Sequence, residues 1–343
     1  MTGTSWPRRL AAVAGGLLAA LVVASPAAAQ DTGVVTGIVV DASGQVVPGA
    51  TVTLVNEAKG DVRTQTTNDH GEFSFRAVTP GSYTVKVELT GFRAFERRNN
   101  VVNASSQLDV GRIPLDIGAL SEVVSVEATG AVVETKNSDY SGLLTSTQIS
   151  QIQTKGRDVV NLLRLLPGVH YENDIDALGD SFGSQIPNIS GQRRTWNQVT
   201  VDGLNGNELS GTNRMNSSIN LDAIAEVKVL LNTYKAEFGR SGGTNIQIVS
   251  KGGGSEYRGS LYYYGRRDAW NANTWLNNKN GVDKAKYHFD TPGISFGGPI
   301  RIPGLVKQGS EKKLFFFYSM EAPQVQKPGP LRKYLMPTAA ISA

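Results

Sequence analysis

The stretch Phe238 to Gly253, FGRSGGTNIQIVSKGG, holds a short segment between two groups of glycines. Apolar and polar side chains alternate in this segment, at Asn245, Ile246, Gln247 and Ile248. Alternation with period two predicts a strand, because successive side chains point to opposite faces. Three glycines, Gly252 to Gly254, then lead into a second strand of different character. We interpret these glycines as a hinge between two environments.

The segment after the hinge, EYRGSLYYYGR, carries a different side-chain type on each face. Tyr257, Leu261 and Tyr263 share one face, and the opposite face holds Glu256, Arg258, Ser260 and Arg266. Such a strand suits the wall of a membrane β-barrel, with a polar lumen inside and lipid outside. Two more candidate strands follow, GISFGGPI at 293–300 and KKLFFFYSMEA at 312–322. We expect an outward loop at Arg267 to Lys286 and a periplasmic turn at 302–312.

Composition supports a mostly β protein. The chain has 343 residues, which is enough for two or three domains, and its 38 glycines predict many turns. The net charge of +4 is small, and Lys and Arg are scattered along the sequence, so we expect no nucleic-acid binding. The absence of cysteine excludes disulfides, thiolate metal sites and cysteine nucleophiles.

The N-terminus has the pattern of a signal peptide. Arg8 and Arg9 form a basic start, Leu10 to Val23 is apolar, and Ala27 to Ala29 ends the segment with small residues. The apolar run is short for a membrane-spanning helix, although an uncleaved anchor helix is the alternative. We predict a signal peptide at residues 1–29, removed after Ala29.

The region from Gly33 to Ile117 predicts a small β-sandwich, because short alternating segments are separated by turn formers such as Pro48-Gly49, Asn68 to Gly71 and Pro80-Gly81. Its wording, GVVTGIVVDASGQVVPGATVTL and TTNDHGEFSFRAVTPGSYTVKVELTGF, closely resembles the carboxypeptidase regulatory-like domain. The resemblance implies a periplasmic or extracellular accessory module without peptidase chemistry.

Residues 120–253 mix strands with helix. Asp158 can cap a helix that Pro167-Gly168 ends. The ordered pieces NISGQRRTWNQVTVDGLN and INLDAIAEVKVLLNTYKAEFGRSGGTNIQIVSKGG resemble the plug domain of TonB-dependent outer-membrane transporters. The fit is closest to the Oar-like branch, which carries a carboxypeptidase regulatory-like domain in front. LLNTYKAEF and SGQRR depart from the pattern of siderophore receptors, which weakens any inference that the ligand is an iron chelate.

The expected fold is therefore mostly β, in three parts: a sandwich at 33–117, an α+β plug at 120–253, and the first strands of a transmembrane β-barrel at 254–343. Outer-membrane transporters have about 22 strands around a plugged lumen. The last part has room for about three strands of barrel length, so we expect an incomplete barrel.

One short segment is a candidate for coupling to energy. Glu122, Val123, Val124, Ser125 and Val126 form a β-prone pentapeptide between the two predicted globular units. In position and wording it resembles the TonB box, the strand that pairs with the periplasmic domain of TonB. The alternatives are that it is the last strand of the sandwich, or only a linker.

Motifs of catalysis and metal binding are missing from the sequence. His70, His170 and His288 lie in three different regions without the spacing of a zinc site. We interpret Glu172, Asp174, Asp176 and Asp180 as a solvated loop rather than a calcium site, and SKGGGS as the hinge rather than a phosphate loop. The runs Tyr262 to Tyr264 and Phe315 to Phe317 suit an interfacial girdle better than ligand-stacking platforms. We expect no enzyme activity, cofactor or metal.

The resemblance implies energy-coupled uptake across the outer membrane of a Gram-negative cell, with the plug gating the barrel. The partners would be TonB, outer-membrane lipid and an extracellular ligand that the sequence does not identify. Two alternatives stay open: a soluble secreted binding or adhesion module, and a nonfunctional gene fragment.

Overall fold

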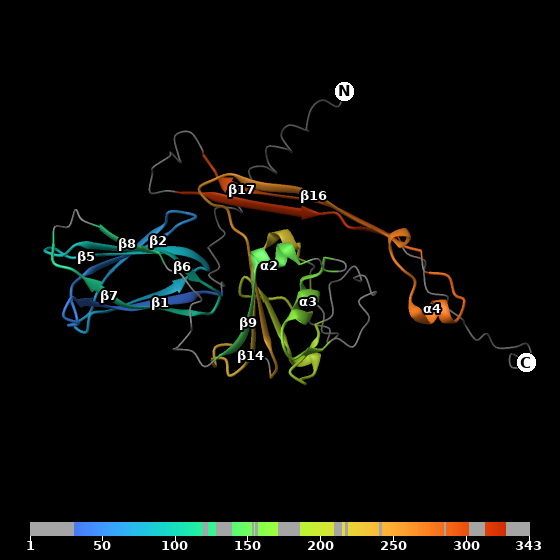
Figure 1. Ribbon diagram of the computed structural model, residues 1–343, viewed down its shortest axis with the longest axis horizontal. Coiled ribbons are helices and arrows are strands. Elements are labelled where there is room, and N and C mark those ends of the chain that lie inside the picture. The colour runs from blue at the N-terminus through green and yellow to red at the C-terminus, as the bar shows by residue number, and fades with distance from the viewer. Residues whose placement is uncertain are drawn as a thin grey trace, which may run out of the picture.

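The computed structural model describes residues 31–118, 123–127, 139–152, 154, 157–170, 186–208, 215–216, 219–239, 242–284, 286–301 and 313–326. These residues form a sandwich, a plug built on a mixed sheet, and a separate antiparallel sheet (Figure 1). The mostly β fold class is confirmed. No helix in the described ranges is long and apolar enough to cross a membrane. The predicted signal peptide, residues 1–29, lies outside the described residues.

The sandwich consists of two sheets that enclose an apolar core. One sheet has the order β4-β1-β7 and the other the order β3-β2-β5-β6-β8. Their bounds are β1 (Gly33–Asp41), β2 (Thr51–Asn56), β3 (Val62–Thr66), β4 (Glu72–Val78), β5 (Gly81–Glu88), β6 (Ala94–Val102), β7 (Gln107–Leu115) and β8 (Val123–Glu127). Along β2 every second residue is buried, as period-two patterning requires.

The turn at Asn68 to Gly71 has the chemistry that its sequence predicts. The Asn68 side-chain oxygen accepts hydrogen bonds from the backbone N–H groups of His70 and Glu72. Gly71 has φ of 70°, and a Cβ atom there would lie 2.6 Å from the carbonyl oxygen of Val39. Only glycine fits this position, both because the backbone is left-handed and because the strand is close. His70 is part of the turn.

β8, the segment proposed for TonB coupling, is an edge strand of the sandwich. It pairs in parallel with β6, where Ala94 lies opposite Val123 and Arg98 lies opposite Glu127. Ser125 and Val126 are exposed. Glu122 lies outside the described residues. The geometry therefore matches one of the alternatives that the sequence left open, the last strand of the sandwich.

The plug is a five-stranded sheet with the order β13-β12-β15-β14-β9. Short helices cover one of its faces. The strands β10 and β11 pair with each other in a separate two-stranded sheet. The bounds are β9 (Tyr140–Thr145), α2 (Ser146–Gln151), α3 (Val159–Leu162), η1 (Leu163–Leu165), β10 (Val169–His170), β11 (Asn188–Ile189), η2 (Arg194–Trp196), β12 (Gln198–Val201), β13 (Leu204–Asn205), η3 (Leu221–Ala223), β14 (Ile224–Asn232) and β15 (Asn245–Ser250). The predicted N-cap is confirmed, since the Asp158 carboxylate accepts from the N–H of Val160.

β15, the strand of the opening stretch, is the central strand of the plug and is buried on both faces. Ile246 and Ile248 belong to the apolar core with the helices. The polar residues of the other face, Asn245 and Gln247, are buried as well, and Gln247 is 0% exposed. The alternation therefore marks two different buried environments. In Figure 1 the helices α2 and α3 and the sandwich lie on opposite sides of the plug sheet.

The last part, which we call the wall sheet, is antiparallel. It contains β16 (Arg258–Arg267), β17 (His288–Pro299), β18 (Phe315–Glu321) and β19 (Gln324–Gln326). β17 pairs with β16 on one side and with β18 and β19 on the other. The strand expected at 293–300 is the second half of β17, which begins earlier, at His288. η4 (Asp268–Trp270) and α4 (Trp275–Lys279) occupy the expected outward loop; the expected turn at 302–312 lies outside the described residues.

The glycine hinge joins the plug to the wall sheet, and one of its glycines is required by a close approach. A Cβ atom on Gly253 would lie 2.3 Å from the carbonyl oxygen of Phe316 in β18. Any larger residue would push β18 away from the chain that enters the wall sheet. The hinge is thus a point of contact as well as a connection.

We predict that residues 31–118 fold alone, because the sandwich core is closed within them. In that piece, Leu54→Ala should lower the free energy of unfolding by about 2–5 kcal/mol, since Leu54 is 1% exposed and its removal leaves a cavity. Val62→Ala is the matched control: Val62 is 60% exposed, so the loss should stay below about 1 kcal/mol. Denaturant unfolding followed by circular dichroism measures both. Equal losses would contradict the assigned core.

Candidate functional site at the contact of plug and wall

The wall sheet has one apolar and one polar face. Leu261 is 85% exposed, and the side chains around it on the same face are Tyr263, Ile294, Phe296, Tyr318 and Met320, all exposed. The cross-strand partners confirm a shared face, since Leu261 lies opposite Ile294 and Ile294 opposite Met320. The predicted separation of faces in β16 is confirmed. This apolar face has the character of a barrel exterior.

The opposite face carries polar groups that bond to one another and to the plug. The hydroxyl groups of Ser260 and Ser295, which are cross-strand partners, lie 2.8 Å apart. Tyr262 and Tyr264 also lie on this face, with ring centroids 5.5 Å apart. The girdle interpretation therefore fits Tyr263 alone among the three tyrosines, because its neighbours face the plug.

On the plug side, two helix starts position the contact residues. Arg157 precedes the N-cap of α3 and has φ of 53°, a left-handed conformation that costs energy outside glycine. Asn220 is the N-cap of η3, and its side-chain oxygen accepts from the N–H of Asp222 at 2.9 Å. Capping fixes Asn220 and Asp222, and the turn before α3 directs Arg157 toward them.

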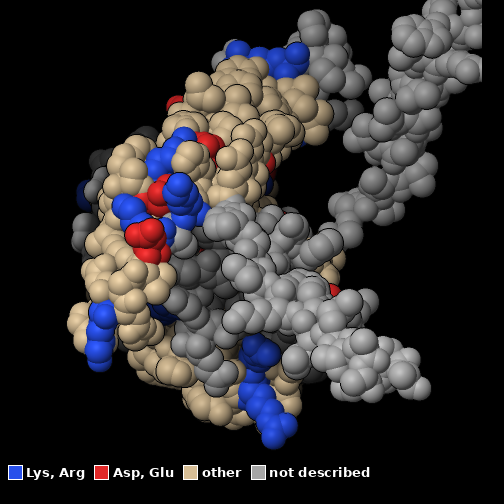
Figure 2. All heavy atoms as spheres, turned by 90° about the vertical axis from the view of Figure 1, so that its right-hand side faces the viewer, with Lys and Arg blue, Asp and Glu red and all other residues tan. Residues whose placement is uncertain are grey.

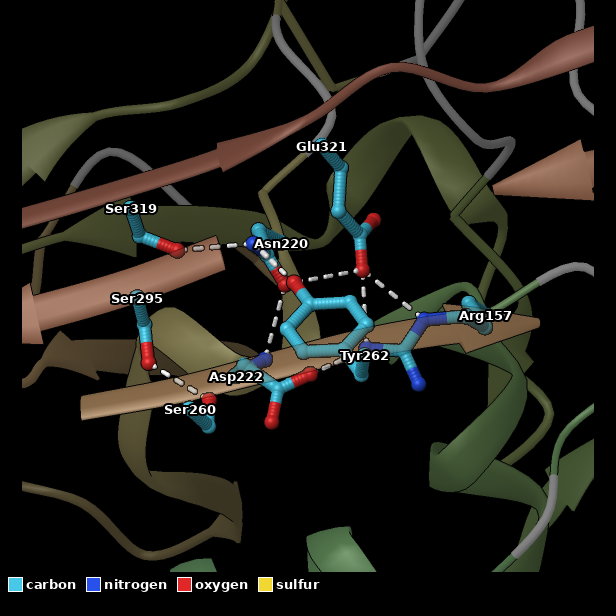
Figure 3. Close-up of polar contacts among 8 residues, drawn as sticks. All are labelled: Arg157, Asn220, Asp222, Ser260, Tyr262, Ser295, Ser319 and Glu321. Carbon is cyan, nitrogen blue, oxygen red and sulfur yellow. Dashed lines mark hydrogen bonds and ion pairs between the residues drawn. The ribbon is translucent and has the colours of Figure 1, made fainter. Parts of the chain in front are cut away.

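Arg157 is the centre of the contact (Figure 3). Its guanidinium forms ion pairs with Asp222 in the plug and with Glu321 in the wall, and its Nε lies 2.8 Å from the Glu321 carboxylate. The guanidinium also lies over the Tyr264 ring, 3.9 Å from the centroid. Burial lowers the pKa of Arg157, but the carboxylates of Glu321 and Asp222 more than offset this, so the group stays charged.

Tyr262 and Asn220 extend this contact. The Tyr262 hydroxyl donates to Glu321 at 3.0 Å and accepts from the Asn220 amide at 2.6 Å. The same amide donates to the Ser319 hydroxyl at 2.7 Å. Arg157 and Asn220 of the plug each bond to groups of the wall sheet, and Asp222 holds Arg157 from the plug side. We call Arg157, Asn220, Asp222, Tyr262, Ser319 and Glu321 the plug–wall cluster.

A second polar contact joins the plug to the sandwich. The backbone N–H of Ala104 donates to the Glu226 carboxylate at 2.5 Å, and the Thr200 hydroxyl donates to Asp31 at 3.1 Å. Both acceptors lie on or against the polar face of the plug sheet. Burial raises the pKa of Glu226, although the Ala104 N–H and Lys228 act in the opposite direction. Burial likewise raises the pKa of Asp31.

The hinge adds a third contact, between the wall sheet and the sandwich. The N–H of Ser255 donates to the carbonyl of Ala58 at 2.9 Å, and the Lys313 ammonium donates to the carbonyl of Gly60 at 2.6 Å. The loop between β2 and β3 therefore lies beside the start of the wall sheet. All three parts meet near this loop.

The residues singled out from the sequence have separate positions. The described part of the coupling segment, β8, belongs to the sandwich and is not part of the plug–wall cluster. Asp202-Gly203 forms the predicted turn, with φ of 50° and 80°, and Asp202 accepts from Ser250. In the described ranges, His, Asp and Glu side chains nowhere gather in threes as metal ligands. The acidic stretch at Glu172 to Asp180 lies outside those ranges.

Sequence reasoning did not single out the plug–wall cluster. Asn220 and Asp222 carried a signal, because Asn followed by Leu and Asp is typical of a helix start. Arg157 and Glu321 carried none, since 164 positions separate them in the sequence.

On the face drawn in Figure 2, Lys and Arg lie in separate small groups, several of them next to Asp and Glu.

Comparison with known families identifies the three parts. Residues 34–116 match the carboxypeptidase regulatory-like domain, residues 136–244 the TonB-dependent receptor plug domain, and residues 249–343 an outer membrane beta barrel domain. The chain thus has the plug and barrel domains of the TonB-dependent outer-membrane receptors, with a carboxypeptidase regulatory-like domain in front.

Among individual proteins, the TonB-dependent transporter Oar of Myxococcus xanthus is 27% identical over 254 residues. The match covers 71% of this chain and 22% of Oar, so the chain spans less than a quarter of that relative. The resemblance to the Oar-like branch is thereby confirmed.

Similar solved structures include the ferric enterobactin receptor of Pseudomonas aeruginosa, at 18% identity and a TM-score of 0.35, covering 49% of this chain and 23% of the receptor. The outer membrane transporter YddB of Escherichia coli has 20% identity and a TM-score of 0.35, covering 46% of this chain and 24% of the transporter.

We predict that Arg157→Ala loosens the wall sheet from the plug. The change leaves the Glu321 carboxylate in a site where it is 14% exposed, and breaking such a pair costs roughly 3 kcal/mol. Hydrogen exchange of β18 amides in detergent should accelerate by about two orders of magnitude, because each factor of ten in the rate corresponds to about 1.4 kcal/mol. Arg258→Ala is the control, because the pair of Arg258 with Glu256 is exposed and contributes at most about 1 kcal/mol. Unchanged protection of β18 in Arg157→Ala would show that the cluster does not hold the wall.

The contact of sandwich and plug should depend on pH through Glu226. A raised folded-state pKa means that the folded state binds the proton more tightly, so this contribution is complete below the ordinary glutamate pKa of about 4.3 and is lost as pH rises through the folded value. Asp31 faces the same region and adds the same sign, whereas Lys228 opposes the shift of Glu226 and the Thr200 hydroxyl opposes that of Asp31.

Glu226→Gln keeps an oxygen that can accept from Ala104 and removes the titration. As pH rises from the ordinary glutamate pKa of about 4.3 toward 8, the midpoint of thermal unfolding of Glu226→Gln should therefore fall less than that of the wild type. Glu237→Gln, at an exposed position, is the control and should follow the wild type. Parallel profiles for the wild type and Glu226→Gln would contradict the assignment.

Proposed function

We propose that this chain forms the sandwich, the plug and the first barrel strands of a transporter in the outer membrane of a Gram-negative cell. The function is energy-coupled uptake of an extracellular ligand, and the plug gates the barrel. The matched domains and the resemblance to Oar support this assignment. Export would use the signal peptide at residues 1–29, cut after Ala29.

The plug–wall cluster is the observation that carries the proposal. It attaches the plug to the polar face of a sheet whose other face is apolar, as a gate inside a barrel wall requires. Water can replace the partners of these polar groups when the plug moves, so opening costs less than separating two apolar surfaces. A soluble secreted module would have no use for the exposed apolar face around Leu261.

Energy coupling would act through Glu122, Val123, Val124, Ser125 and Val126. The segment lies between the stretches that the two family models match, 34–116 and 136–244. Its residues from Val123 onward adopt the extended conformation that strand addition requires. The partner is the periplasmic domain of TonB. The transported ligand is an extracellular molecule that neither the sandwich nor the plug identifies.

Because strand addition uses backbone hydrogen bonds, Val124→Pro should abolish binding of the periplasmic TonB domain. Proline removes an N–H donor and fixes φ. Val124→Thr keeps both the backbone and the β-propensity, so it should bind like the wild type. A pull-down with the detergent-solubilised chain measures all three. Equal binding by the wild type and Val124→Pro would place the coupling strand elsewhere.

A further inference from the structure

The inference concerns the free edge of β8. β8 is the last strand of its sheet, with β6 on one side and no other strand of the described residues on the other. Consecutive residues of a strand direct their N–H and C=O groups to alternate sides, so about half of these groups point away from β6. An unpaired row of this kind is a template for a strand of another chain.

The two edges of the same sheet differ in how they are protected. At the β3 edge, the Arg63 guanidinium donates to the carbonyls of Arg76 and Ala77 in the other sheet, at 2.8 Å and 3.2 Å. This cation ties β3 across the sandwich and places a charge at the edge, a common protection against pairing. The β8 sequence, VVSVE, has no lysine, arginine or proline, and Ser125 and Val126 are exposed. Glu127 is the one charged residue of β8, so among the described residues the β8 edge is the less protected of the two.

We infer that the sandwich presents β8 to TonB: an edge strand of the periplasmic TonB domain pairs with the outer edge of β8 while β8 stays paired with β6. This inference rests on the proposed function, from which it takes the partner. It adds that the carboxypeptidase regulatory-like domain supplies one side of the interface. The sheets of the two proteins then become continuous through β8.

Presentation on the sandwich has an energetic reason. A free pentapeptide must lose backbone entropy of about 1–2 kcal/mol per residue when it joins a sheet. In β8 the pairing with β6 has already ordered the backbone, so TonB gains hydrogen bonds without that cost. In the alternative, TonB displaces β6 and must first break the existing parallel pairing.

An engineered disulfide separates these two routes. Glu96 and Ser125 are cross-strand partners, so Glu96→Cys with Ser125→Cys can lock β8 to β6. Adjacent strands lie about 4.8 Å apart, within the Cα range of a disulfide. The natural chain has no cysteine, so no other bridge can form. The full chain is purified in detergent, its affinity for the periplasmic TonB domain is measured oxidised and reduced, and each single cysteine variant is the control.

The inference predicts that the oxidised and reduced double variants bind TonB within about twofold of each other, because locking breaks no bond that TonB uses. Loss of binding on oxidation, with binding restored by reduction, would overturn the inference and leave the proposed coupling intact. Failure of the wild type and the single variants to bind would overturn both.

Hydrogen exchange of the unmodified chain supplies a second readout. In the free chain, alternate β8 amides should be protected by β6. In the complex, the remaining β8 amides should gain protection while β6 amides keep theirs. Faster exchange of β6 amides in the complex would mean that β8 leaves the sandwich, against the inference.

Discussion

The position of the plug against the wall depends on one partly buried cation, Arg157. A guanidinium whose side chain is 12% exposed needs carboxylate partners, because an unpaired charge in such a site is costly. Asp222 supplies one from the plug itself, and Glu321 supplies the other from β18. Glu321 is thereby fixed relative to the plug. The Tyr262 hydroxyl donates a further hydrogen bond to the Glu321 carboxylate and accepts one from the Asn220 amide.

The faces and edges of the sheets in all three parts follow from the same requirement that polar groups find partners. β15 has neighbours on both sides and is covered on both faces, so its polar residues lie toward the sandwich and its apolar ones toward the helices. The wall sheet has one face against the plug and one apolar face that suits lipid. β8 is one of the edge strands, with β6 as its only neighbouring strand among the described residues, and it lies between the stretches that the two family models match.

Much of the fold could be predicted because it rests on local patterns. Period-two alternation identified β2 and β16, Gly71 identified a turn, and Asp158 identified a helix start. The burial of Gln247 could not be predicted, because it depends on a sandwich that begins some two hundred residues earlier in the chain. The pairing of β8 with β6 is likewise a choice between alternatives that the segment itself does not encode. For the same reason Glu321 gave no sign of its partner, since ion pairs between distant segments leave no periodicity.

The interiors of the parts and the contacts between them differ in chemistry, and this difference would let the chain stay folded under the gating that we propose. Inside the sandwich and the plug, the cores are apolar. Opening either core would expose side chains such as Leu54 or Ile248 to water, which is unfavourable because apolar groups form no hydrogen bonds with it. Between the parts, the described contacts that fix their positions are mainly hydrogen bonds and ion pairs, at Arg157, Glu226 and Gly60. Water can satisfy these groups when a contact opens, so force applied to the chain separates the parts before it unfolds any of them. A pull at β8 would therefore reach the plug through polar contacts that can break and form again, while each core keeps its structure.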